Sequence, residues 1–322
     1  MKKIRSKKLI ILFLVLAMVL TTFTACGKIN SNEDVKQNEE VVEEKENKVQ
    51  YPMEIEDQFG NKVTIKNEPK TIVSLAPSHT EILFSLGLGD RIVGVTEYCD
   101  YPEEAKSKEK VGSFTGVNIE RIIELDPDIA FQFGPGDEEV NAKIRDAGIV
   151  LLCYEPDSID EVMNLIQNIG KITNTEDEAI KVVDDMKAKK DEIVNKVKDE
   201  EKVKVFYEIW DDPLMAAGPG SFMDELMTLA GGENIASDAE GEYPQFDMEQ
   251  LIERNPDVYL GAKDSEEKTV ESIKERPGFE NINAVKNDRV YLLDPNIVSR
   301  PGPRIIDALE LVAKSIHPDA FK

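Results

Sequence analysis

Short apolar runs alternate with amphipathic stretches along most of the chain, and this alternation predicts a parallel α/β fold. The apolar runs are typical of buried strands, and the stretches between them carry apolar residues at helical spacing. The predicted strands are residues 71–76, 91–96, 128–133, 149–154, 203–210, 257–262 and 289–294. We expect helices at 137–148 and 221–234, and a first helix capped by Thr80 and ended by Gly87 and Gly89.

One stretch of the sequence occurs twice. GSFTGVNIERIIELDPDIA, which begins at Gly112, returns without a gap as GEYPQFDMEQLIERNPDVY, which begins at Gly241, 129 residues later. The copies share glycine, aromatic, glutamate, isoleucine, proline and aspartate positions. Because the second half of the chain also repeats the strand and helix order of the first, we expect two similar lobes.

The segment between the two lobes predicts one long helix. From Thr175 onward it holds no Gly or Pro for about 25 residues and carries apolar residues at helical spacing. Such a helix spans roughly 35 to 40 Å, comparable with a lobe, so we expect a stiff rod and little hinge closure. The predicted domains are an N-terminal lobe at 51–174, this helix at 175–200 and a C-terminal lobe at 201–322.

Residues 1–26 are typical of targeting sequence. Lysines and an arginine precede a twelve-residue apolar run and then TTFTAC, whereas a membrane-spanning helix needs about 20 residues. Cys26 after Ala25 resembles the lipobox of bacterial lipoproteins, and the alternative is an ordinary secretory signal with an incidental cysteine. Residues 27–50 are rich in Glu, Lys and Asn and predict a disordered tether. We expect a protein anchored by lipid to the extracytoplasmic face of the cell membrane.

The net charge, the cysteine content and the motifs that are absent limit the classes of function that the sequence allows. A formal net charge of -25 at pH 7 argues against nucleic acid and anionic membrane as partners. Cys99 and Cys153 lie at the ends of predicted strands of the same lobe, so either a disulfide or two unlinked thiols is compatible with the sequence. The sequence has two histidines and no CxxC pair, so it contains no recognisable motif for a zinc site. The absence of GxSxG, P-loop, HExxH and dinucleotide motifs leaves an exported α/β enzyme as a remote alternative.

Each copy of the repeat opens a predicted helix. Asn118 and Asp247 suit the N-cap position, which places Glu120 and Glu249 in the first turns. A glutamate there interacts favourably with the helix dipole, and this is the simpler interpretation. A second glutamate follows four residues later in each copy, so an acidic pair that docks a basic partner is the alternative.

Aromatic residues cluster near the ends of predicted strands. Phe114 and Tyr243 occupy equivalent loops of the two copies, and loops that follow parallel strands meet at the crevice where α/β proteins bind ligands. The others are Tyr98, Tyr101, Phe133 and Trp210. Each alone is compatible with a core position, but together they suit a large, flat or partly apolar ligand.

Four segments resemble the substrate-binding proteins of ABC importers for vitamin B12, ferric siderophores and haem. They are KTIVSLAPSHTEILFSLGLGDRIVGVTEYCDYPEEAK, VGSFTGVNIERIIELDPDIAF, EYPQFDMEQLIERNPDVYL and SRPGPRII, and the resemblance extends from Tyr51 to Lys322. It implies two Rossmann-like lobes joined by one rigid helix, with the ligand between them: the class III periplasmic-binding-protein fold. Within this family the pattern is nearest to the cobalamin-binding branch. The resemblance therefore implies a monomer that binds a corrinoid and delivers it, without catalysing a reaction, to the permease dimer of an ABC importer.

The resemblance also implies residue roles. Tyr98, Phe114, Phe133 and Tyr243 match aromatic residues that line the corrinoid pocket of that branch. Glu120 and Glu249 match the glutamates, one per lobe, that pair with arginines of the permease, which favours docking over a dipole role alone.

Departures from the pattern leave the ligand open. Smaller aromatics replace pocket tryptophans, while Trp210 stands beside a position that is phenylalanine in the branch. His79 replaces an asparagine, and it is either a hydrogen-bonded loop residue or an axial ligand to cobalt or haem iron. Arg300 and Arg304 either anchor ligand amides and carboxylates or are structural. The alternative ligands are haem, with His79 and Tyr98 as candidate iron ligands, and an anionic ferric siderophore held by Arg300.

Overall fold

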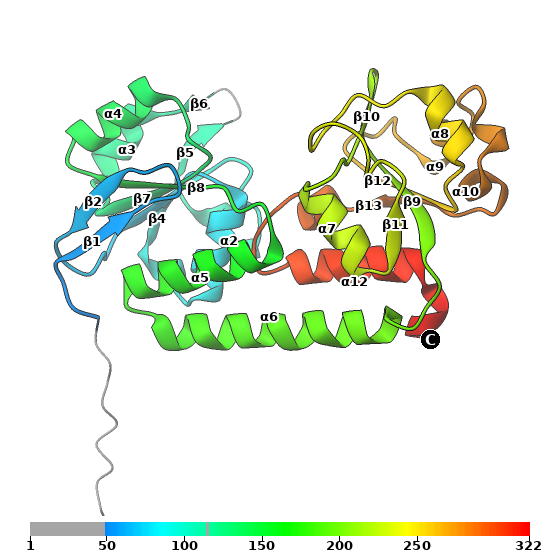
Figure 1. The fold of residues 1–322 in the computed structure, drawn as a ribbon. Coiled ribbons are helices and arrows are strands. Elements are labelled where there is room, and N and C mark those ends of the chain that lie inside the picture. Colours follow the sequence, from blue (N-terminus) through cyan, green and yellow to red (C-terminus); the bar gives the residue numbers. More distant parts are fainter. Residues whose placement is uncertain (1–48, 114–115) are drawn as a thin grey trace, which may run out of the picture. The chain divides into compact units, whose positions relative to one another are not determined.

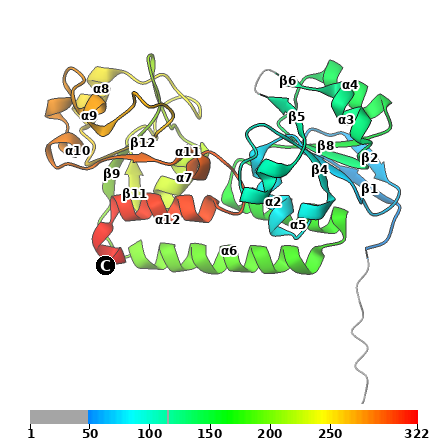
Figure 2. The same cartoon turned by 180° about the vertical axis from the view of Figure 1, so that it is seen from behind.

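Two β-sheets with helices on their faces form the body of the protein; the computed structural model describes residues 49–113 and 116–322 (Figures 1 and 2). The first lobe is built on six strands in the order β6-β5-β4-β3-β7-β8. Neighbouring strands are parallel except β5 and β6, which are antiparallel. The strands are β3 (Ile72–Ser74), β4 (Ile92–Thr96), β5 (Lys110–Ser113), β6 (Gly116–Val117), β7 (Ile129–Phe133) and β8 (Val150–Tyr154).

Helices cover both faces of this sheet (Figure 1). They are α2 (Pro77–Ser85), α3 (Ile119–Leu125), α4 (Glu138–Asp146) and α5 (Ile159–Thr173), with the 3₁₀ turns η1 (Gly89–Arg91) and η2 (Glu103–Ser107). In Figure 1, α3 and α4 lie on one face while α2 and α5 lie on the other. Burial on both faces explains why strands such as β7 are almost wholly apolar. An antiparallel hairpin of β1 (Met53–Glu56) and β2 (Lys62–Ile65) packs beside β8.

The second lobe is built on a five-stranded sheet. The strands are β9 (Val203–Asp211), β10 (Leu214–Ala216), β11 (Gly232–Asn234), β12 (Val258–Ala262) and β13 (Val290–Leu293). β9 pairs in parallel with β11 and β12, β12 pairs in parallel with β13, and β10 is antiparallel to β9. The helices are α7 (Phe222–Leu229), α8 (Met248–Arg254), α9 (Val270–Lys274), α10 (Asn283–Lys286), α11 (Pro295–Val298) and α12 (Ile305–Ile316), with η3 (Phe279–Asn281) and η4 (Pro318–Phe321).

The helix α6 (Glu176–Val197) runs beneath both lobes and packs against α5 of the first and α12 of the second (Figures 1 and 2). A single hydrophobic cluster continues from the first lobe through this helix layer into the second. Separate clusters fill the other face of each sheet. The predicted long helix and the two mostly parallel α/β lobes are therefore confirmed.

Several details differ from the sequence-based expectation. Thr80 is not the cap of the first helix: α2 begins at Pro77, and the Thr80 hydroxyl donates to the Ala76 carbonyl inside the first turn. Pro77 is well suited to this start because the first helical position needs no N–H. The strands β1, β2, β5, β6, β10 and β11 were not predicted, and β11 occupies Gly232–Asn234, where the sequence predicted the end of the helix at 221–234. The helix α7 instead ends at Leu229, before Gly231, which has a φ of 82°.

The two cysteines in the described part of the chain are free thiols. Cys99 and Cys153 are both buried, and the structure has no bond between them. The Sγ atom of Cys99 lies 3.1 Å from the Thr80 and Thr96 hydroxyls, and burial raises the pKa of Cys153 to about 11. In the described part of the chain, no helix has the length and apolar character needed to cross a membrane.

Candidate ligand-binding site

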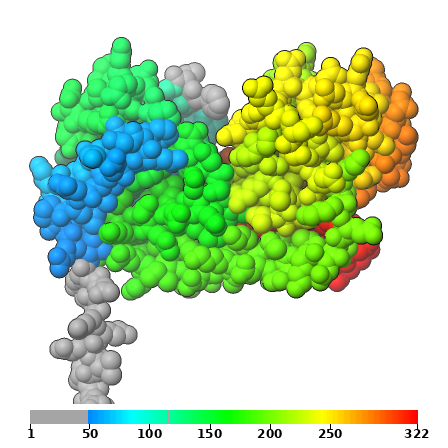
Figure 3. Space-filling model, viewed as in Figure 1, coloured from blue at the N-terminus to red at the C-terminus, as the bar shows by residue number. Residues whose placement is uncertain are grey.

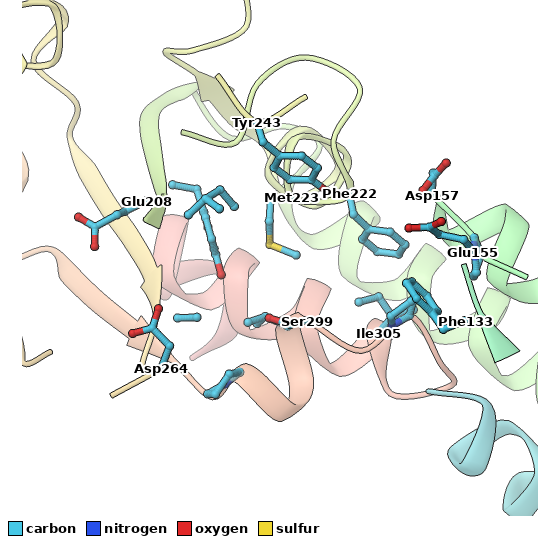
Figure 4. Close-up of a pocket in the computed structure, with 17 residues that line it drawn as sticks. Phe133, Glu155, Asp157, Glu208, Phe222, Met223, Tyr243, Asp264, Ser299 and Ile305 are labelled. Atoms are coloured by element: carbon cyan, nitrogen blue, oxygen red, sulfur yellow. The ribbon is translucent and has the colours of Figure 1, made fainter. Parts of the chain in front are cut away.

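A cavity of about 370 Å³ lies between the lobes, at the carboxyl ends of the parallel strands (Figure 4). From the first lobe, Phe133 is the last residue of β7 and Glu155 directly follows β8. From the second lobe, Ala262 ends β12 and Pro295 begins the helix after β13. Strand ends of two parallel sheets thus meet at one place, which is where α/β proteins bind ligands. The surface is notched between the two lobes on the side away from α6 (Figure 3).

Four aromatic side chains give the cavity an apolar wall: Phe133, Tyr207, Phe222 and Tyr243. Phe133 is 38 % exposed and Tyr243 is 49 % exposed, so two large rings from opposite lobes are open to an incoming ligand. In Figure 4 Phe133 lies on the first-lobe side and Tyr243 on the second-lobe side. Burial raises the pKa of the Tyr243 phenol, and the charges of Glu242, Asp157 and Glu155 raise it further. A flat apolar ligand between the lobes therefore has rings available on both sides.

The charged residues of the lining are acidic. They are Glu155, Asp157, Glu208 and Asp264, and none of the seventeen lining residues is Lys or Arg. Burial and the nearby Glu161 raise the pKa of Asp157. These groups accept hydrogen bonds and repel anions, so the lining suits neutral amide donors or cations.

One of these carboxylates is already neutralised within the second lobe. The side chain of Glu208 is fully buried, and its oxygens bond Lys268 at 3.0 Å as well as Arg276 and the Tyr259 hydroxyl. Burial alone would raise the pKa of Glu208, but the Arg276 and Tyr259 hydrogen bonds outweigh it and lower the pKa. Figure 4 shows the Glu208 carboxylate pointing away from the cavity.

Gln58 holds the first-lobe rim in place, and sequence analysis did not identify it. Its side-chain amide donates to the Glu155 carbonyl at 2.8 Å and accepts from the Glu155 N–H at 2.7 Å. The hairpin of β1 and β2 therefore braces the segment that carries Glu155 and Asp157. No local pattern signals this role, because the two residues are 97 positions apart.

Of the aromatic residues predicted to bind ligand, Phe133 and Tyr243 line the cavity. Phe114 lies outside the described residues. Tyr98 and Trp210 do not line this cavity, although they are 47 % and 53 % exposed. Trp210 follows the lining residue Ile209, and its indole N–H donates to the Asp212 carbonyl at 2.9 Å.

The two arginines of SRPGPR are occupied by protein groups. Arg304 forms a bidentate pair with the buried carboxylate of Glu81, at 2.6 and 2.8 Å. Arg300 bonds Asp100 at 2.6 Å and Glu81 at 3.3 Å. Neither arginine lines the cavity.

His79 is wholly buried at the start of α2, with its ring centroid 6.1 Å from that of Phe133. Neither ring nitrogen has a hydrogen-bond partner among the described residues. Burial lowers the pKa of His79 to about 4, so the ring is neutral at pH 7. Phe133 lines the cavity, but His79 does not. Within the described residues, no group of three or more His, Cys, Asp or Glu side chains is placed to hold a metal ion.

The repeat copies form equivalent structures. Asn118 and Asp247 are the N-caps of α3 and α8, as predicted, and their side chains accept from backbone N–H groups of the first turn. Glu120 and Glu249 are exposed in those turns. Both helices lie on the side of their lobes away from α6 (Figure 1).

Two α/β lobes over a connecting helix, with an aromatic and acidic cavity at their facing strand ends, define a two-lobed small-molecule binding protein. The profile of the family described as "Periplasmic binding protein" matches residues 72–297, and the chain belongs to this family. It is thus an extracytoplasmic substrate-binding protein of the ABC-transporter type rather than an enzyme.

Relatives with known names cover most of the chain. An uncharacterized ABC transporter substrate-binding lipoprotein of Bacillus subtilis, YvrC, is 39 % identical over 96 % of both chains. A vitamin B12-binding protein of Vibrio cholerae is 32 % identical over 75 % of this chain and 87 % of its own. The crystal structure of a possible iron-binding protein from Staphylococcus epidermidis is 33 % identical, with a TM-score of 0.71, over 78 % of this chain and 100 % of that one.

Proposed function

We propose that this protein captures a corrinoid between its lobes and delivers it to an ABC importer. The observation that carries the proposal is the cavity lining, which combines aromatic rings from both lobes with carboxylates and, among the described residues, contains no Lys or Arg. A corrinoid offers a flat, partly apolar macrocycle and many peripheral amide groups. The rings of Phe133 and Tyr243 would pack on the macrocycle, and the carboxylates of Glu155 and Asp157 would accept amide N–H donors.

The alternative ligands fit this lining less well. Haem carries two propionates, and catecholate or carboxylate siderophores are anionic, so each needs cationic partners. The arginines that the sequence offers for this role, Arg300 and Arg304, are paired with Glu81 and Asp100. One observation favours haem: the buried ring of His79 has no hydrogen-bond partner and lies beside Phe133. Because His79 is fully buried and does not line the cavity, a haem iron would reach it only after the surrounding side chains moved.

Binding of a ligand panel to the full-length protein in detergent tests the proposal. We expect isothermal titration to show tight binding of cyanocobalamin and much weaker binding of haemin and of a ferric tris-catecholate. Trp210 is the single tryptophan of the chain and stands next to the cavity, so its fluorescence should be quenched by bound cobalamin. If haemin gives a shifted Soret band and cobalamin is not retained by the protein on gel filtration, the ligand is haem rather than a corrinoid.

Alanine variants locate the site. Phe133→Ala and Tyr243→Ala should each weaken cyanocobalamin binding by about ten-fold or more, since exposed aromatic anchors often contribute over 1 kcal/mol. Phe59→Ala is the matched control, because Phe59 is also an exposed phenylalanine, 40 % accessible, but lies outside the cavity. If all three variants bind cyanocobalamin with the same affinity, the cavity is not its binding site.

The remaining assignments concern the importer and the membrane. We assign Glu120 and Glu249, one exposed carboxylate per lobe, to contacts with basic residues of the permease dimer. Cys26, outside the described residues, is the proposed lipid attachment site, and 27–50 the tether to the body. The proposed division of the body is 51–174, 175–200 and 201–322, with the ligand between the first and last parts.

A further inference from the structure

A buried carboxylate of the first lobe is held by two arginines of the second. Glu81, in α2, has a side chain that is 2 % exposed. Its two oxygens accept from Arg304 Nη2 at 2.6 Å and Nε at 2.8 Å, and Arg300 Nη1 lies 3.3 Å away. Both arginines lie in the short segment between α11 and α12. The pair therefore crosses from one lobe to the other at the floor of the crevice.

The same arginines hold the loop that follows β4. Arg300 donates to the Asp100 carboxylate at 2.6 Å and to the Tyr98 carbonyl at 3.4 Å. The guanidinium of Arg304 stacks on the ring of Tyr101, 3.8 Å from its centroid. From the second lobe, Asn296 accepts from both arginines, at 2.5 Å through its side chain and 3.0 Å through its carbonyl. Two segments of the first lobe are thus tied to one segment of the second.

The backbone between the arginines fits closely on α2. A Cβ atom on Gly302 would lie 3.3 Å from the Ser78 carbonyl oxygen, so even a methyl group there would require the two backbones to shift by a few tenths of an ångström. The Glu81 hydrogen bonds raise the pKa of Arg304. Burial opposes ionisation of Asp100, but the Arg300 hydrogen bond and charge outweigh it and lower its pKa. A buried carboxylate with satisfied charge partners is strongly destabilised when one partner is removed, so the arrangement has one favoured geometry.

We propose that Glu81, Arg300 and Arg304 form an interlobe clasp, a set of positioning residues that fixes the distance between the two walls of the binding cavity and the place of the Tyr98 loop. Its partner elements adjoin the cavity directly, since Ser299 and Pro301 line it. On the other side of the crevice the Glu225 carboxylate accepts from the Ile159 N–H at 2.9 Å, which ties α7 to α5. The binding role of the clasp rests on the proposed function, whereas its effect on lobe separation does not.

Distance measurement between the lobes tests the clasp without any ligand. Spin labels are placed at Glu139→Cys in α4 and Glu253→Cys in α8, both exposed positions, in the full-length protein in detergent. The native Cys99 and Cys153 are buried, which protects them from labelling. We expect a narrow distance distribution for the otherwise unchanged protein, and a broader or shifted one for Glu81→Gln. Asp57→Asn is the control, because Asp57 is a buried, hydrogen-bonded carboxylate that acts only within the first lobe.

A second variant covers the case in which Glu81→Gln does not fold. Arg304→Lys keeps the charge but loses the bidentate geometry, and it should also broaden the distribution. With cyanocobalamin as probe, either variant should raise the dissociation rate by about ten-fold, because a site that must be ordered on binding loses affinity. If both variants keep the original distance distribution, the clasp is refuted. If the distribution changes and cyanocobalamin binds to no form of the protein, the clasp stands and the proposed ligand fails.

Discussion

The chemistry of His79 is set by its surroundings rather than by its residue type. It is one of two histidines in the chain; the other, His317, is also buried but lies within hydrogen-bonding distance of the Gly231 carbonyl, at 3.3 Å. His79 has no such partner and sits against Phe133. Burial without a partner disfavours the charged imidazolium, which is why its pKa falls to about 4.

This difference predicts a specific pH dependence of stability. The unfolded chain protonates His79 near its usual pKa of about 6.5, whereas the folded protein does so only near pH 4. Between these values the unfolded state binds more protons, so the contribution of His79 is fully present above pH 6.5 and is lost as pH falls toward 4. Relative to His79→Asn, the free energy of unfolding should drop by roughly 2.5 kcal/mol between pH 7.5 and 4.5.

Urea unfolding at both pH values measures the effect, with Ile172→Val, at a buried site without a titratable group, as the control. The Ile172 variant and the unchanged protein should keep a nearly constant difference between the two pH values. A constant difference for the His79 variant as well would mean that this ring is hydrated or partnered in solution.

The residue scale also shows why the sequence left two roles open for Arg300 and Arg304. Arg300 and Arg304 have the chemistry to bind anions, and their sequence neighbours Ser299 and Pro301 do line the cavity. Their availability depends on Glu81, about 220 positions away, and no local pattern reports such a contact. Phe133 was easier to place, because the end of a parallel strand fixes a residue at the crevice.

At the scale of elements, the contact between α5 and α6 depends on one glycine. A Cβ atom added to Gly170 would lie 2.5 Å from the Ala179 Cβ and 3.0 Å from the Thr175 carbonyl oxygen. Gly170→Ala would gain about 1 kcal/mol from helix propensity but lose about 1–3 kcal/mol by overpacking. We expect overpacking to win, with a net loss of about 1 kcal/mol measured by chemical denaturation.

A double-mutant cycle separates the two effects. In the Ala179→Gly background the closest contact is gone, so Gly170→Ala should be neutral or stabilising there. The two substitutions should therefore be coupled by about 1 kcal/mol or more. Stabilisation by Gly170→Ala in the unaltered background would show that the helices separate without penalty.

The elements that sequence predicted well are those with strong local signals. Asn118 and Asp247 carry side chains that cap, and both helices begin where the sequence places them. The break before α6 is equally local: Asn174 adopts the left-handed conformation, with φ of 58°, and ends α5. The start of α2 was missed because its cap, Ala76, makes no side-chain hydrogen bond. The edge strands β6 and β10 were missed because two or three residues give no periodicity.

At the scale of the whole molecule, the repeat places one glutamate on each lobe in equivalent positions. Glu120 and Glu249 are exposed on first turns of α3 and α8, away from α6 (Figure 1). The like charge at i+4 in the first copy is moderated, since Arg121 pairs with Glu124 at 2.5 Å. Under the proposed function, these two carboxylates would face the two subunits of a permease dimer.

The double reversal Glu120→Lys with Glu249→Lys tests this docking surface. Exposed ion pairs contribute only about 0.2–1 kcal/mol each, but lysines placed opposite the basic residues proposed for the permease would repel them by several kcal/mol. We therefore expect uptake of labelled cyanocobalamin by cells to be abolished while the affinity of the isolated protein stays within about two-fold. The loss of complex formation with the permease should be greatest at low ionic strength, where repulsion is least screened.

Asp184→Lys with Asp191→Lys supplies the matched control, because it makes the same change in net charge at exposed positions of α6. This control should keep normal uptake. The helix-dipole interpretation makes the opposite prediction for Glu120 and Glu249: the reversal should lower stability by about 0.3–1 kcal/mol per helix and leave uptake intact. Thermal unfolding measured beside uptake distinguishes the two, since loss of transport in a protein whose folded fraction is unchanged can arise only from the interaction with the importer.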